Sequence, residues 1–136
     1  DIYDVLKYVD LTKDIFVVKH DYHPVEGTKF LGNVQHVYPK KNWSSFIVFN
    51  CFKNGCKRLT PEIVNGLSGK YLHQFEWATE IGELPIEWNH LVGEYDENPD
   101  ARVVHFTLGT PCFEGYSSQE WANEWFRELD LMGDCI

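Results

Sequence analysis

The chain has 136 residues, of which 43% are hydrophobic and 15% aromatic, and its 21 acidic and 12 basic side chains give a formal charge of −9. A chain of this length buries about two thirds of the surface that its unfolded form exposes, which is enough for one hydrophobic core and not for two. The apolar runs Ile15–Val18 and Phe46–Phe49 are short, whereas a membrane-spanning helix needs about 20 apolar residues. We therefore expect one small acidic domain without a membrane span.

The net charge and the cysteine spacing also limit the binding partners and the cellular compartment that we expect. A charge of −9 repels polyanions at long range, so we expect no nucleic-acid partner, and a small anionic ligand would need local cations or a metal ion. Residues 1–4 have neither the basic start nor the apolar stretch of a secretory signal. The spacing of Cys51, Cys56, Cys112 and Cys135 fits neither a disulfide scaffold nor a zinc site. The sequence thus predicts reduced thiols and a cytoplasmic location.

The first half of the chain predicts a helix, a strand, a long loop and a second strand. Apolar residues from Ile2 to Val9 fall on one helical face, and Ile15–Lys19 is typical of a short buried strand. Residues 21–42 show no sustained period and predict a long loop, a kind of segment that is usually functional or disordered. Trp43–Asn50, rich in β-branched and aromatic residues, is the best candidate for a central strand.

The histidine-rich segment 20–23 could suggest a metal cluster. Adjacent side chains of an extended chain point in opposite directions, so one ion could not easily bind all of them. We interpret this segment as a loop at the rim of a cleft.

The second half predicts two helices and a third strand. Thr60 as N-cap, followed by proline, predicts a short helix to about Leu67. A strand is predicted at Arg102–Phe106, and Ser117 with Glu120 forms a capping-box pattern before an amphipathic helix that ends at Met132. We expect the strands at 15–19, 43–50 and 102–106 to share one sheet with this last helix packed on it, in an α/β or α+β domain.

Three segments together resemble the catalytic domain of GT-A-type nucleotide-sugar glycosyltransferases, close to glycosyltransferase family eight and related bacterial and phage sequences. Lys40–Asn50 is similar to a family segment of Asn, Ser and a strand, Leu84–Asn89 matches the pattern Leu-Pro-x-x-Trp-Asn, and Val104–Pro111 is similar to the C-terminal His, Gly, Lys-Pro-Trp motif. Their order and spacing agree over about residues 1–116. The resemblance implies an α/β fold of the GT-A type, a mixed sheet flanked by helices, which transfers a hexosyl-type sugar from a nucleotide-diphosphate donor to a glycan or other acceptor.

Two departures from the family pattern bear on activity. The family's Asp-x-Asp metal motif would lie just before Asp1, and the chain contains no Asp-x-Asp; the lysine of the third motif is Thr110 here. We therefore expect residues 1–136 to be a single domain, the C-terminal part of a glycosyltransferase catalytic domain that lacks its N-terminal nucleotide-binding strands and is inactive alone.

The resemblance also implies a divalent cation. Charge builds on the departing diphosphate, and Mn or Mg would stabilise it. His105, at the end of a strand and before a glycine-containing loop, is the implied metal ligand. A strand-end histidine that bonds to the backbone is the alternative, and the residues alone leave both interpretations open.

The remaining candidates are assigned to substrate by the same resemblance. Gly109 would let the backbone approach the diphosphate, and Lys40 and Lys41 could supply the charge that Thr110 lacks. Gln74 is the candidate near the reacting sugar, where the family has an acid. The full substrate-binding set is Lys40, Asn42, Trp43, Ser44, Ser45, Trp88, Asn89, Gly109 and Pro111.

Each of these residues also has a structural interpretation. Trp43 and Trp88 suit a core, Gly109 an ordinary turn, and the lysines a solvated surface. The two functional hypotheses are therefore a glycosyltransferase domain and a non-catalytic carbohydrate-binding or interaction domain. For the transferase we expect His105, Gly109, Ser44 and Asn89 to line a common cleft.

Overall fold

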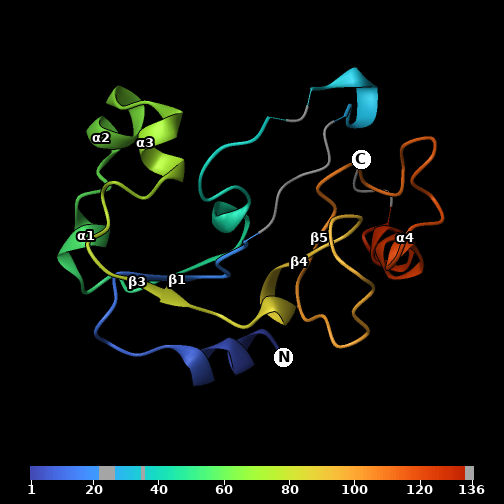
Figure 1. Ribbon diagram of the computed structural model, residues 1–136. Coiled ribbons are helices and arrows are strands. Elements are labelled where there is room, and N and C mark those ends of the chain that lie inside the picture. The colour runs from blue at the N-terminus through green and yellow to red at the C-terminus, as the bar shows by residue number, and fades with distance from the viewer. Residues whose placement is uncertain (22–26, 35, 134–136) are drawn as a thin grey trace.

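The computed structural model describes residues 1–21, 27–34 and 36–133. Cys135, and Tyr22 and His23 of the histidine-rich segment 20–23, lie outside these ranges. The chain is a mixed α/β structure with small sheets and short helices (Figure 1). The strands are β1 (Ile15–Val17), β2 (Ile47–Phe49), β3 (Ile81–Glu83), β4 (His90–Leu91) and β5 (Val104–His105). The α-helices are α1 (Asn54–Lys57), α2 (Pro61–Gly66), α3 (Gly69–His73) and α4 (Ala122–Leu131). The 3-10 helices are η1 (Ile2–Tyr8), η2 (Phe30–Gly32), η3 (Trp43–Ser45) and η4 (Ile86–Asn89).

The described strands form two sheets. β1 is the central strand of a three-stranded sheet, antiparallel to β2 and parallel to β3, while β4 and β5 form a separate parallel pair. The prediction that the strands at 15–19 and 43–50 share a sheet is confirmed. The prediction that the strand at 102–106 joins them is wrong, because β3 occupies the place beside β1 and β5 pairs with β4 instead.

The central strand β1 is buried on both faces, as its continuous apolar run predicts. Side chains alternate, so Phe16 and Val18 pack with Val5, Leu84 and Trp88 on one face. On the other face, Ile15 and Val17 pack with Phe75 and Trp77. The core is therefore two thin layers that share one strand.

Strand β3 escapes sequence analysis because it is short and contains Gly82. The aromatic ring of Phe16 lies against this glycine: a Cβ on Gly82 would lie 2.3 Å from Phe16 Cδ1. The close approach of two neighbouring strands therefore requires glycine here, although glycine disfavours strands in general.

The helix beginning after Thr60 is confirmed, with the Thr60 hydroxyl accepting from the Ile63 amide at 3.4 Å. The capping box at Ser117 is wrong: α4 begins only at Ala122, because the Glu120 carboxylate is used elsewhere, by His90 and the Asn98 amide. Segment 43–45 is a 3-10 helix, and only residues 47–49 of the second predicted strand pair with β1.

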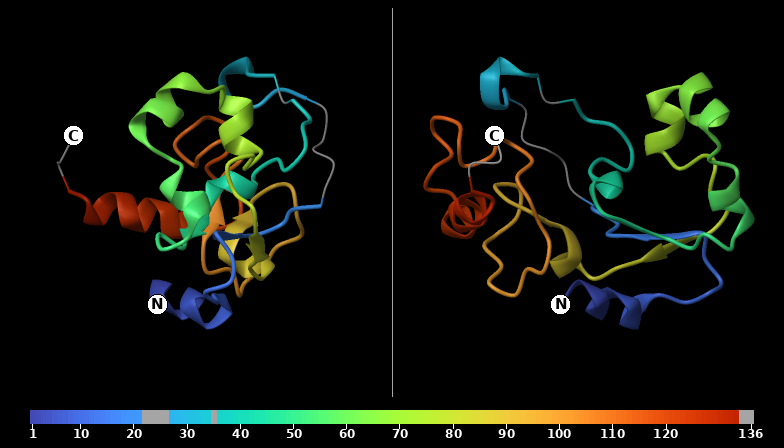
Figure 2. Two further views of the ribbon diagram at one scale, coloured as in Figure 1. Left: turned by 90° about the vertical axis from the view of Figure 1, so that its left-hand side faces the viewer. Right: turned by 180° about the vertical axis from the view of Figure 1, so that it is seen from behind.

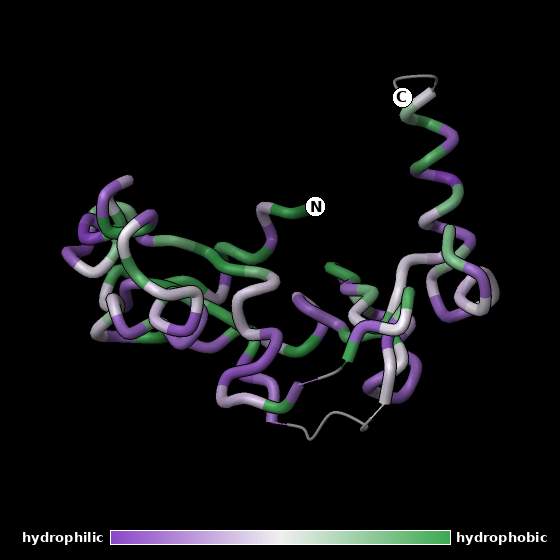
Figure 3. Tube along the Cα trace, turned by 90° about the horizontal axis from the view of Figure 1, so that it is seen from above, coloured by the Kyte–Doolittle hydropathy of each residue, from purple (hydrophilic) through white to green (hydrophobic). Residues whose placement is uncertain are grey.

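Helix α4 does not pack on the three-stranded sheet as expected. It lies on the side of β4 and β5 (Figures 1 and 2), and it extends away from the rest of the chain with hydrophilic and hydrophobic residues intermixed along it (Figure 3). Its last apolar residues are exposed, Leu131 by 74%. Among the described residues, no helix is both long enough and apolar enough to span a membrane.

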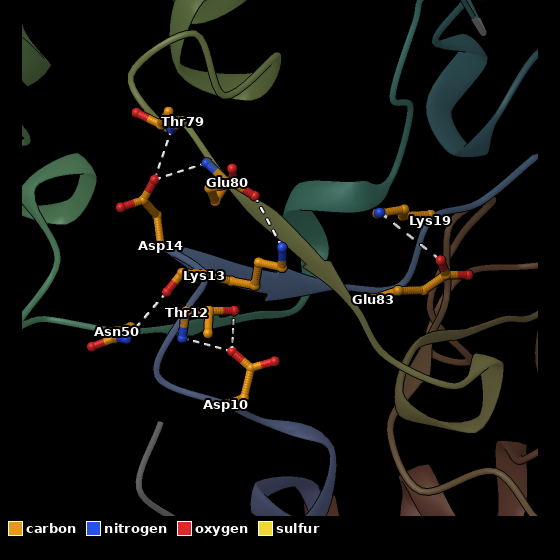
Figure 4. Close-up of polar contacts among 9 residues, drawn as sticks. All are labelled: Asp10, Thr12, Lys13, Asp14, Lys19, Asn50, Thr79, Glu80 and Glu83. Atoms are coloured by element: carbon orange, nitrogen blue, oxygen red, sulfur yellow. Dashed lines mark hydrogen bonds and ion pairs between the residues drawn. The ribbon is translucent and has the colours of Figure 1, made fainter.

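The Asp14 carboxylate joins three segments at one end of the sheet (Figure 4). It is 1% exposed and accepts hydrogen bonds from the amides of Gly55 at 3.1 Å, Thr79 at 2.7 Å and Glu80 at 2.9 Å. Burial alone would raise its pKa, but these three bonds outweigh that effect and the pKa is lowered. Asp14 therefore ties the segments at this end of the sheet together.

Candidate functional site

Three segments that are distant in sequence meet at the carboxyl end of β1. Val17 is in register with Ile47, the first residue of β2, and with Glu83, the last residue of β3. Residues that follow β1, precede β2 or follow β3 therefore emerge at one edge of the sheet. These residues are His20, the segment Asn42–Ser45, and Asn89.

Asn89 is the residue that connects these segments. Its side chain is fully buried, and Nδ2 lies 3.0 Å from His20 Nε2, 2.8 Å from Ser45 Oγ and 3.1 Å from the Asn42 carbonyl oxygen. The Ser45 hydroxyl in turn donates to the Asn42 carbonyl at 2.6 Å. Two of the predicted sugar-binding segments, 42–45 and 84–89, are thus held together directly.

His20 is held in its neutral form. Burial, and secondly the neighbouring His105, lowers the pKa of its imidazole from 6.5 to about 4. Because Asn89 Nδ2 donates to Nε2, the ring proton lies on Nδ1, which is 3.0 Å from Tyr95 Oη. The His20 carbonyl accepts from Trp43 Nε1 at 2.9 Å. Both the ring and the backbone of His20 are therefore fixed.

His105 lies next to this network, at the end of β5. Burial, and secondly the charge of Lys29, lowers the pKa of His105. Its Nδ1 and the hydroxyl oxygen of Thr107 are buried and have no hydrogen-bond partner among the described residues. Unpaired buried polar atoms are costly, and a ligand or an ordered water molecule that reached these two atoms would remove that cost.

Two lysines complete the site. Lys41 is only 7% exposed; its Nζ donates to the His36 carbonyl at 2.6 Å and lies 5.6 Å from the centre of the Tyr38 ring. Burial, and secondly the charge of Lys29, lowers the pKa of Lys41. Lys29 Nζ donates to the Thr107 carbonyl at 2.8 Å. Within the described residues neither ammonium group lies within ion-pair distance of a carboxylate, although the more distant charge of Glu94 acts to raise the pKa of Lys41.

Two hollows open beside these groups and share the wall Val37–Pro39. The first, of about 340 Å³, is also lined by His20, Asp21, Lys40 and Lys41, and we call it the cation hollow. The second, of about 570 Å³, is also lined by Gly69, Lys70, His73 and Gln74, and we call it the α3 hollow. Lys40 connects them, because it lines the first and its Nζ donates to the Gln74 carbonyl at 2.7 Å.

The other predicted site residues lie outside the Asn89 network. Ser44 Oγ is 2.7 Å from His73 Nδ1, beside the α3 hollow. Trp88 is 2% exposed and stacks with Phe46, so its side chain belongs to the core.

Gly109 and Pro111 are placed by packing. A Cβ on Gly109 would lie 2.9 Å from Tyr116 and 3.1 Å from Phe30, so the tight contact requires glycine at this position. Pro111 is fully buried. Of the four residues expected to share a cleft, Asn89 and His105 both neighbour His20, whereas Ser44 and Gly109 contact other residues.

Sequence reasoning missed Tyr95, Lys29 and Thr107, and it treated His20 only as part of a loop. The signal for His20 was present, since it follows the most buried strand by a few residues and polar residues at strand ends commonly form sites. Tyr95 and Lys29 lie in loops without any periodic pattern.

The described residues around His105 do not by themselves form a site for a hard divalent cation. Mn and Mg prefer several oxygen ligands. The neighbours of His105 are the His20 imidazole and the Lys29 ammonium. No group of three His, Cys, Asp or Glu residues in the described ranges is arranged to hold a metal ion. His105 could supply one ligand only.

Comparison with known proteins gives one informative similarity. Protein CDI of Arabidopsis thaliana is 42% identical over an alignment of 137 residues, gaps included, and this alignment covers 93% of this chain and 53% of that protein. The chain thus spans about half the length of this relative. No protein-family model and no solved structure matches the chain. The name Protein CDI states neither an activity nor a ligand, so function has to be argued from the geometry of the site.

Proposed function

We propose that this chain is part of a GT-A-type glycosyltransferase and that the cation hollow receives the diphosphate of a nucleotide-sugar donor. The observation that carries the proposal is Lys41, a buried ammonium beside a second lysine, which has no described carboxylate within ion-pair distance and feels the charge of Glu94 only from farther away. A buried cation without a counterion is costly, and a bound anion would remove that cost. The chain as a whole has a charge of −9, so a buried ammonium group without a contacting carboxylate is unusual in this protein.

Lys29 and Lys41 would take the role of the lysine that the third motif lacks at Thr110. Negative charge builds on the diphosphate as the sugar departs, and ammonium groups fixed before the reaction stabilise it. The unpaired Thr107 hydroxyl and His105 Nδ1 belong to residues that neighbour Lys29, although neither residue lines the cation hollow. The positive charge of the lysines suits a phosphate better than a neutral ligand.

The Asn89 network would give the donor site its rigidity. Neutral His20, Ser45 and the 42–45 segment are fixed by mutual hydrogen bonds before any ligand binds. Such preorganisation reduces the entropy that binding costs. Asn42, Ser44 and Ser45 remain the proposed contacts to sugar hydroxyl groups.

A metal ion and an additional chain segment belong to the same proposal. Mn or Mg would stabilise the leaving diphosphate, with His105 as one ligand and carboxylates from outside the described residues as the others. The relative is about twice as long as the matched segment, which is compatible with a missing nucleotide-binding part. We expect residues 1–136 alone to show little or no transfer of sugar.

The alternative is a non-catalytic carbohydrate-binding domain. The observation that favours it is the α3 hollow, whose wall includes Tyr38, a ring that is 44% exposed. Aromatic rings of this kind bind the C–H faces of sugars without any need for a nucleotide.

Titration calorimetry with UDP and with inorganic pyrophosphate, each with and without Mn, tests the proposal. We expect both to bind through the diphosphate alone, because the proposed nucleotide-binding part lies outside this chain. Lys41→Met should weaken both at least about tenfold, since a neutral side chain of similar length loses the charged contact. Lys57→Met is the matched control, because Lys57 is exposed on α1. Sugar binding without any binding of UDP or pyrophosphate would establish the alternative.

A further inference from the structure

We propose that the α3 hollow binds the acceptor as a neutral carbohydrate ring. The inference deepens the proposed function and rests on it, since an acceptor is needed only if the cation hollow holds a sugar donor. The position of the hollow is the first argument. It shares the wall Val37–Pro39 with the cation hollow, and the Lys40–Gln74 hydrogen bond of 2.7 Å spans the two.

The lining of the α3 hollow suits a sugar. Most of its surface is apolar, from Val37, Tyr38 and Pro39, and its polar groups are a few side chains of α3 and the residue that follows it. Small-molecule sites combine apolar walls with a few directed polar groups in this way. A tyrosine face binds the C–H face of a sugar ring, while amide, imidazole and ammonium groups bind its hydroxyl groups.

The His73 imidazole is positioned by Ser44. Ser44 Oγ lies 2.7 Å from His73 Nδ1, whereas His73 Nε2 forms no hydrogen bond to a described residue. One ring nitrogen is therefore held, and the other is available to a hydroxyl group of a ligand. This arrangement gives Ser44 a positioning role, although it lies outside the Asn89 network.

Charge separates the two hollows. The ammonium group of Lys70 in the α3 hollow is exposed to water, which screens its charge, whereas Lys41 in the cation hollow is buried. Of the two hollows, the buried ammonium group that favours a diphosphate lies in the cation hollow. A neutral ring with hydroxyl groups is the ligand that matches the α3 hollow.

Gly69 offers a direct way to block the α3 hollow. A Cβ at Gly69 would meet only His73 Cδ2, at 4.0 Å, and φ at this position is not positive, so a side chain fits without strain and fills the hollow. Gly66, at the end of α2, is the matched control, because a Cβ there meets nothing within 4 Å and Gly66 does not line the hollow.

The experiment measures the binding of maltose, cellobiose and lactose, and separately of UDP, by titration of the labelled chain in NMR spectra. We expect at least one disaccharide to shift the amide signals of Lys70 and Gln74. Gly69→Trp should weaken its binding at least about tenfold and Gly66→Trp should leave it unchanged, while both variants keep the UDP affinity of the parent. The same spectra show whether each variant is folded.

The inference would be overturned if none of the disaccharides binds, or if Gly69→Trp binds them as the parent does. It would also be overturned if Gly69→Trp loses the binding of both UDP and sugar, because the hollow would then hold the nucleoside. Failure of the proposed function looks different. If UDP binds nowhere while Gly69→Trp still removes disaccharide binding, the carbohydrate site stands and the donor site is wrong.

Discussion

Asn89 Nδ2 lies 3.0 Å from His20 Nε2, although 69 residues separate the two in sequence. The contact exists because β1 and β3 run parallel and end at the same edge of the sheet, so the residues that follow them meet. It fixes the His20 ring, and the same Asn89 amide group bonds Asn42 and Ser45 and so joins two of the segments that resemble glycosyltransferase motifs.

The Asn89 network predicts a large loss of stability in Asn89→Ala. The substitution leaves His20 Nε2 and the Asn42 carbonyl without the Asn89 amide, in a place with no access to water. We expect the free energy of unfolding to fall by about 2 to 3 kcal/mol. Urea denaturation monitored by tryptophan fluorescence measures it.

Asn65→Ala is the control for this prediction, because Asn65 is exposed on α2 and a change there should cost little. Equal effects of the two substitutions would mean that the Asn89 network adds nothing to the fold.

The depressed pKa of His20 predicts a loss of stability in mild acid. The unfolded state binds the proton near 6.5, whereas the folded state binds it only near 4, because of burial and then the charge of His105. Between these pH values the unfolded state holds more protons, so the free energy of unfolding decreases as the pH falls from 6.5 towards 4, by about 3 kcal/mol for this group.

The measurement is the free energy of unfolding at several pH values in this window, for the parent and for His20→Gln. The variant should show a flatter dependence, and the lowered pKa of His105 should account for part of what remains. His73→Gln, on the exposed side of α3, should follow the parent. Identical curves for His20→Gln and the parent would contradict the assignment of a neutral buried His20.

The hydrogen bonds of the Asp14 carboxylate predict a second position, at the opposite end of the sheet, where a substitution lowers the stability of the fold strongly (Figure 4). Asp14→Asn keeps the shape but replaces one of the two acceptor oxygens by an NH2 group, so that either the Gly55 amide or the amides of Thr79 and Glu80 lose their acceptor. We expect a loss of about 2 to 3 kcal/mol of unfolding free energy. Thermal and urea unfolding measure it.

Asp10→Asn is the matched control for Asp14, since Asp10 is exposed and an asparagine oxygen can still accept from the Thr12 amide. If Asp14→Asn is as stable as this control, the three amide bonds are not what holds the sheet end together.

Local patterns were readable from the sequence where local physics decides the structure. The Thr60 cap and α2 depend on a few neighbouring residues, and the burial of β1 on both faces follows from its apolar run. The predicted capping box at Ser117 failed because Glu120 binds His90 and the Asn98 amide instead, contacts that a local pattern does not contain.

The candidate site was only partly readable for the same reason. Asn89, Ser45 and His105 were singled out by resemblance, and Asn89 bonds Ser45 directly. The residue that neighbours both Asn89 and His105 is His20, which no motif contained. Gly109 is required by its close packing against Tyr116, and the sequence alone does not distinguish such a glycine from one that binds a ligand. Contacts between distant segments depend on strand order, and β3 was not visible as a strand.

The lowered pKa of Lys41 predicts that anion binding takes up protons. Burial, and secondly Lys29, makes protonation of Lys41 harder than usual, so its pKa in the free protein lies below 10.5. A bound pyrophosphate would favour the ammonium form and raise this pKa. Affinity should therefore fall as the pH rises through the pKa of the free lysine, because binding must then also supply a proton.

Calorimetric titration of pyrophosphate at a mildly alkaline pH, in two buffers with different heats of ionisation, measures the uptake directly. We expect uptake by the parent and by Lys57→Met, whose exposed lysine lies on α1. Lys41→Met should bind more weakly and take up fewer protons, since the group that is protonated on binding is absent. Unchanged proton uptake in Lys41→Met would contradict the prediction, because it would mean that Lys41 is not the group that is protonated when the anion binds.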